Sequence, residues 1–121
     1  NGDFAIDSDW VKLGLGTISG GVGTITGDAT TGNRLQQNTV LIVGYKYMRS
    51  YDILTNTLVG GASPSRISDT SNVIDLVDSV GVNSDIFESL SANFSFRTKS
   101  VITSGSITID YCSIKRILQA P

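Results

Sequence analysis

The stretch from Asn33 to Leu54 constrains the fold of this chain most, because it contains the longest run of alternating side chains. Side chains of a β-strand point to opposite faces in turn, so a period of two predicts one half-buried strand at the centre of a sheet. A shorter apolar strand is expected at Val40–Val43, before the break at Gly44. The side chains expected to face inward on the long strand are Tyr45, Tyr47, Arg49, Tyr51 and Ile53.

Further short strands are expected along the rest of the chain. Thr17–Thr26 predicts a hairpin around Gly20-Gly21, and Asp85–Leu90 and Asn93–Arg97 alternate like strands. Ser106–Leu118 predicts a closing strand with a bulge near Tyr111–Ser113, where its apolar face changes side. Eight to ten strand candidates and no clear helix predict a single all-β domain over residues 1–121, an antiparallel β-sandwich of the jelly-roll kind. Its expected core contains Phe4, Tyr47, Tyr51, Phe94, Phe96 and Ile109.

Residues 72–82 fit two structures. Val73, Leu76, Val77 and Val80 have helical spacing, whereas the β-branched residues in the same stretch favour a strand. We predict a strand, because the surrounding segments are all β.

The composition excludes several classes of function. The chain has no histidine and one cysteine, Cys112, so it can form neither a Ser-His-Asp triad nor a His or Cys-rich metal site. Cys112 lies in an apolar alternating segment and is expected to be a buried small hydrophobe. The net charge of −2 argues against nucleic acid and anionic membrane surfaces as partners. No segment reaches the ~18 apolar residues that indicate a membrane-spanning helix.

Five segments together resemble a known family. They occur in the order NGDFAIDSDW, TISGGV, LQQ, LIVGYKYMRSYDI and SITIDYCSIKRI. This order resembles the galactose-binding-like jelly-roll family, which includes many carbohydrate-binding modules, in the version found in tail-fibre and other virion proteins of bacteriophages. The most specific markers are the opening NGDF, Gly44–Tyr47 and Ile109-Asp110. The chain begins at Asn1 without methionine or a signal-like segment, which we interpret as a piece processed or excised from a longer polypeptide.

The resemblance implies a metal site, and this chain differs from the family at two positions. Calcium-binding relatives build their site from the opening strand and the terminal aspartate, which correspond to Asp3 and Asp110 here. Ala5 stands where those relatives often carry an acidic ligand, so weak calcium binding or no cofactor is expected. Arg49 stands where relatives usually have an aliphatic residue.

The inward position of Arg49 has two interpretations. An unpaired buried guanidinium is costly, so Arg49 must reach a carboxylate, solvent or a ligand. It could lie at the rim of the sandwich, paired with an aspartate. It could instead line a ligand groove with Tyr45 and Gln37. Trp10 is a further candidate for stacking on a sugar, although a lone tryptophan more often covers a core.

These observations predict a non-catalytic attachment module of a phage particle, located on the extracellular virion and working in several copies. Its expected partners are surface glycan or neighbouring virion proteins, and the alternative function is a purely structural capsid-decoration or fibre domain. Acidic pairs such as Asp75 and Asp78 could support glycoside hydrolysis in principle. Such pairs arise by chance in a chain with 11 acidic residues, so we expect no enzyme.

Overall fold

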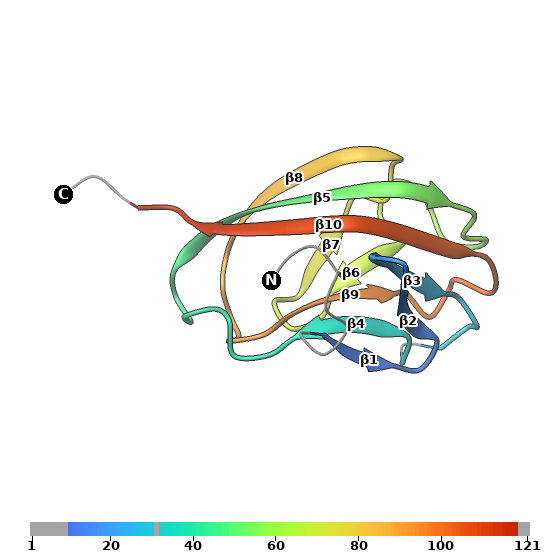
Figure 1. Cartoon of the computed structure of the whole chain (residues 1–121), viewed down its shortest axis with the longest axis horizontal. Coiled ribbons are helices and arrows are strands. Elements are labelled where there is room, and N and C mark those ends of the chain that lie inside the picture. The colour runs from blue at the N-terminus through green and yellow to red at the C-terminus, as the bar shows by residue number, and fades with distance from the viewer. Residues whose placement is uncertain (1–9, 31, 119–121) are drawn as a thin grey trace.

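The fold consists of two antiparallel five-stranded sheets in a computed structural model, which describes residues 10–30 and 32–118 (Figure 1). The first sheet has the order β1 (Val11–Leu13), β4 (Arg34–Gln37), β9 (Phe94–Thr98), β6 (Ile67–Asp69) and β7 (Ile74–Leu76). The second sheet has the order β2 (Gly16–Ser19), β3 (Val22–Thr26), β10 (Ser106–Arg116), β5 (Lys46–Asn56) and β8 (Gly81–Glu88). None of the described residues is helical, which confirms the predicted all-β sandwich.

The chain crosses repeatedly between the sheets, as in a jelly roll. The predicted central strand is β5, which lies between β10 and β8 and has 11 residues. Its alternation holds from Tyr47 onward, because Tyr47, Arg49, Tyr51 and Ile53 are buried while the residues between them are more exposed. Tyr45 was also expected to face inward, but it precedes β5 and is 41% exposed. No described helix is long and apolar enough to cross a membrane.

The core lies between the two sheets and includes five of the six residues predicted for it. Tyr47, Tyr51, Phe94, Phe96 and Ile109 belong to one buried cluster. The rings of Tyr51 and Phe96 meet edge to face across the sandwich, with centroids 5.4 Å apart. The sixth residue, Phe4, lies outside the described residues, as does the expected opening strand.

Two local features follow the sequence closely. Gly20 and Gly21 both have positive φ, at 60° and 76°, and join β2 to β3 in the tight turn that such a pair favours. The pairing of β10 with β5 shifts register between Ile109 and Cys112, next to the bulge predicted at Tyr111–Ser113. This shift places Cys112 on the buried side of the strand.

Two expectations for the loops and short strands have different outcomes. The predicted strand at Val40–Val43 is wrong, because this segment carries the chain from β4 in one sheet to β5 in the other. It has no strand partner there, and only Leu41 is buried. The backbone N–H groups of Val40 and Leu41 both donate to the carbonyl of Ala92 instead, at 2.9 Å. In residues 72–82 the predicted strand is confirmed in part, because Ile74–Leu76 form β7 and residues 81–82 begin β8, while the remaining residues are not in a strand.

Candidate functional site

Arg49 is fully buried in the middle of β5 and forms two ion pairs. Asp85 lies directly opposite it on β8, and the carboxylate receives hydrogen bonds from Nε at 3.0 Å and Nη2 at 2.8 Å. Nη1 donates to Asp69 on β6, in the other sheet, at 2.8 Å. The guanidinium also lies 4.4 Å from the ring centre of Phe87. Burial opposes the charge, yet the two carboxylates outweigh it and raise the pKa of Arg49.

Asp69 extends this arrangement into a polar network between the sheets. The carboxylate receives the backbone N–H and hydroxyl of Ser95 on β9, at 3.1 and 3.3 Å, and the side-chain amide of Asn72 at 2.8 Å. The oxygen of the Asn72 amide in turn accepts the backbone N–H groups of Leu90 and Ser91. Each donor finds an acceptor without water, so this network stabilises one alignment of the two sheets. Arg49 is therefore a structural residue with no surface for a ligand.

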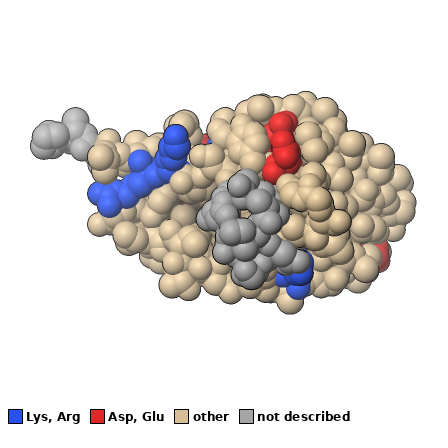
Figure 2. Space-filling model, viewed as in Figure 1, with Lys and Arg blue, Asp and Glu red and all other residues tan. Residues whose placement is uncertain are grey.

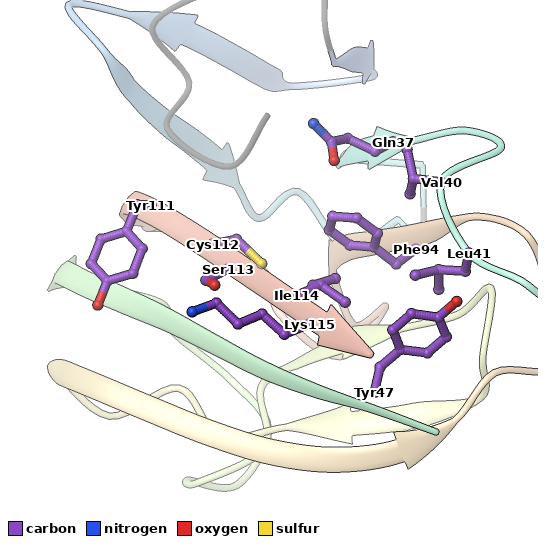
Figure 3. A pocket seen from close by; sticks show the side chains of 10 residues that line it. All are labelled: Gln37, Val40, Leu41, Tyr47, Phe94, Tyr111, Cys112, Ser113, Ile114 and Lys115. Carbon is purple, nitrogen blue, oxygen red and sulfur yellow. The ribbon is translucent and has the colours of Figure 1, made fainter. Parts of the chain in front are cut away.

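The candidate site is an open groove of about 540 Å³ at one end of the sandwich (Figure 3). This volume lies within the ~300–1,000 Å³ range of small-molecule sites. It is lined by Gln37 from β4, Val40 and Leu41 from the following loop, Tyr47 from β5, Phe94 from β9, and Tyr111, Cys112, Ser113, Ile114 and Lys115 from β10. Figure 3 shows Phe94, Leu41, Tyr47 and Ile114 gathered at one end, and Tyr111 at the other. An apolar base and polar margins therefore share one groove.

The chain positions these groove residues through two irregularities. The register shift in β10 reverses its alternation, so that Cys112 is buried while Tyr111 and Ser113 are half-buried. The loop after β4 is anchored by the hydroxyl of Tyr47, which accepts the backbone N–H of Ile42 at 2.8 Å. The predicted burial of Cys112 is confirmed, and burial raises the pKa of its thiol to about 12. This thiol is consequently protonated at neutral pH and is not a nucleophile.

The structure separates the four residues predicted to contact a ligand. Gln37 lines the groove, while Trp10 is 4% exposed and packs edge-on against Phe94 with ring centres 5.6 Å apart. This burial corresponds to the core-covering alternative for Trp10 and leaves no open ring face for a sugar. Tyr45 is 41% exposed but stacks under the guanidinium of Arg116, beside a second hollow of about 270 Å³. With Arg49 buried, no single groove unites Tyr45, Arg49 and Gln37.

The predicted metal ligands cannot be compared as a pair. Asp3 lies outside the described residues, and Asp110 is exposed on β10. Within residues 10–30 and 32–118, no three acidic or cysteine side chains come together as a metal cluster would require. The calcium site therefore stays a prediction.

Sequence reasoning predicted only Gln37 among the groove residues and missed its margin on β10, namely Tyr111, Ser113 and Lys115. Their signal was the switch of apolar face in Ser106–Leu118, which was interpreted only as a bulge. A strand that changes face at its end exposes polar side chains next to the core, and that combination suits a binding groove.

Charged side chains are sparse on the surface that Figure 2 shows. On the face shown in Figure 2, uncharged residues predominate, and the few positive and negative side chains lie in separate small groups. Comparisons with protein-family models, curated proteins and solved structures find no match to this chain.

Proposed function

We propose that this chain is a non-catalytic attachment module of a bacteriophage particle, which binds surface glycan in the groove between β4 and β10. The groove carries this proposal. Sugars combine apolar ring faces with many hydroxyl groups, so their sites combine aromatic surface with amide, hydroxyl and charged groups. Tyr111 supplies the first kind of surface, and Ser113 and Lys115 supply the second, while Tyr47 and Gln37 are buried beneath the groove.

Two further observations support a binding role. The ordered resemblance to carbohydrate-binding modules spans residues 1–117 and points to modules that bind without turnover. The thiol of Cys112, which lies on the groove, is buried and protonated.

Binding to an array of bacterial surface glycans tests this proposal. Tyr111→Ala should weaken binding about two- to tenfold, because stacking on an aromatic ring contributes about 0.5–1.5 kcal/mol. The melting temperature should change little, since Tyr111 is only half-buried. Tyr45→Ala is the matched control, because it removes an exposed tyrosine beside the second hollow. Binding that survives Tyr111→Ala but not Tyr45→Ala would place the glycan in that hollow instead.

A second candidate is a purely structural role in the virion, as a capsid-decoration or fibre domain. The outer face of the second sheet favours it, because Met48 on β5 and Ile86 on β8 lie directly opposite each other and are 43% and 66% exposed. Val82, which is 63% exposed, lies on the same face further along β8. This role would be favoured if the domain binds no glycan on the array and if replacing these residues by polar ones prevents its incorporation into particles. Turnover of glycan by the purified domain would contradict both roles.

Weak calcium binding through Asp3 and Asp110 belongs to the same proposal. A ligand that binds the native state raises stability by RT ln(1 + [L]/Kd). The melting temperature of metal-free protein should therefore rise in millimolar calcium and fall again with chelator, and Asp110→Asn should remove this response. Magnesium at the same concentration controls for ionic strength. An unchanged midpoint in the metal-free protein would exclude the site.

A further inference from the structure

Strand β8 forms one edge of the second sheet, and its outer side is open. It pairs with β5 through Glu88 to Gly81, and no described residue pairs with its other side (Figure 1). The other edge strands β1, β2 and β7 have only three or four residues, whereas β8 has eight. An edge strand of this length presents a row of free backbone N–H and C=O groups, to which another extended strand can hydrogen-bond.

The sequence of β8 has few of the features that normally protect such an edge, and its one inward-pointing charge, Asp85, is paired with Arg49. Gly81–Glu88 contains no lysine, arginine or proline, and its register with β5 is regular throughout. Of its two acidic residues, Asp85 is held by Arg49, and Glu88 lies at the end of the strand. The exposed side chains in the strand include Val82 and Ile86. This edge is therefore regular, and its outer face carries two exposed apolar side chains and one charge, at its end.

We propose that two copies of this chain associate through β8, antiparallel and about a two-fold axis at Ser84. Their two five-stranded sheets then form one continuous sheet. A two-fold axis makes the interface self-complementary, so one unprotected edge suffices for both partners. Backbone hydrogen bonds between the strands would provide affinity, and side-chain pairs on the outer face would provide specificity.

The alternation of side chains limits where the axis can lie. Directly opposed residues in an antiparallel pair point to the same face of the sheet. The two-fold axis must therefore pass through the position of one residue, which then faces its own copy, and not between two neighbouring residues. An axis at Asp85 would oppose two carboxylates, which is destabilising. An axis at Ser84 opposes two small hydroxyl side chains and sets Ile86 against Val82 of the second copy, on both sides of the axis. Met48, opposite Ile86 on β5, extends this apolar contact.

Each Glu88 then lies at an outer end of the paired strands, opposite Val80 of the second copy. Lys46 is the cross-strand neighbour of Glu88 on β5, so the carboxylate has a nearby positive charge in each copy. The paired strands thus join without opposing like charges. This inference is independent of the glycan proposal, although a dimer would also carry two grooves and gain avidity on a repetitive surface.

Sedimentation of the whole chain at concentrations from micromolar to millimolar tests the interface. The wild-type protein should approach twice its mass of 12.8 kDa as the concentration rises. Ile86→Lys should raise the dimer Kd at least tenfold, because it places a charged side chain twice in the interface. Val101→Lys, at a 55% exposed valine outside β8, should leave the dimer intact. Circular dichroism of each variant should show that the fold is retained.

A cross-link tests the position of the axis. Directly opposed residues lie about 4.5–5.5 Å apart between Cα atoms, within the reach of a disulfide. Ser84→Cys should therefore form a disulfide-linked dimer under mild oxidation, while Val101→Cys should not. A wild-type chain that stays monomeric throughout would overturn the proposal. A dimer that persists in Ile86→Lys, or that gives no disulfide through position 84, would also overturn it.

Discussion

Arg49→Met should lower the free energy of unfolding by about 3–5 kcal/mol, since it leaves a buried carboxylate without its cation. The side chain of Asp69 is fully buried and that of Asp85 is 25% exposed. Leaving Asp69 without a cation should therefore account for the larger part of the lost stability. Methionine approximates the length of the arginine stem, so the change removes charge and hydrogen bonds more than volume. Chemical denaturation of the variant and the wild type measures the effect.

Arg116→Met is the matched control for this measurement. Arg116 is exposed and lies over the ring of Tyr45 at 4.5 Å, so its replacement should cost less than about 1 kcal/mol. Arg49→Lys should fall between the two, because an ammonium group keeps the charge but cannot bond both carboxylates in the same fork geometry. Equal losses for Arg49→Met and Arg116→Met would show that the network between the sheets contributes no particular stability.

Phe96→Ala should cost about 3–5 kcal/mol, because it opens a cavity in the centre of the sandwich. Phe96 is completely buried and its ring contacts those of Trp10, Tyr51 and Phe94. Phe94→Ala should cost less, although Phe94 is also buried. Phe94 borders the open groove, so water can enter part of the space that its ring leaves.

Denaturation of both variants gives this difference directly. The larger loss should belong to Phe96→Ala, with an unchanged dependence on denaturant concentration if the compactness of both states is preserved. If Phe94→Ala loses as much free energy of unfolding as Phe96→Ala, or more, part of the chain must close the groove in solution. The same two variants thus report on the core and on the candidate site.

Arg49 shows how far local pattern can be followed. Its inward position could be predicted, because it occupies one place in the alternation of β5, and its need for a carboxylate followed from the cost of burying a charge. The identity of its partners could not be predicted. Asp69 and Asp85 lie 20 and 36 residues away along the chain, and only the pairing of β5 with β8 and the stacking of the sheets bring them together.

The candidate site was less predictable than the core. Gln37 lies on a groove without Tyr45 or Arg49, Trp10 is turned into the core, and Tyr45 lies at a different hollow. A loop such as Val40–Val43 has an apolar composition like that of a strand. Its conformation depends on which sheets it connects, which no local pattern encodes.

The sequence by itself determined the all-β class, the central strand, the glycine hairpin, the bulge in the closing strand and most of the core. These features depend on side-chain period and turn chemistry, which act over a few residues. Only the tertiary structure decided which charged groups meet, where the groove opens and which strand lies at an edge. Those features depend on contacts between residues far apart in the chain, and such contacts arise only when the two sheets pack face to face.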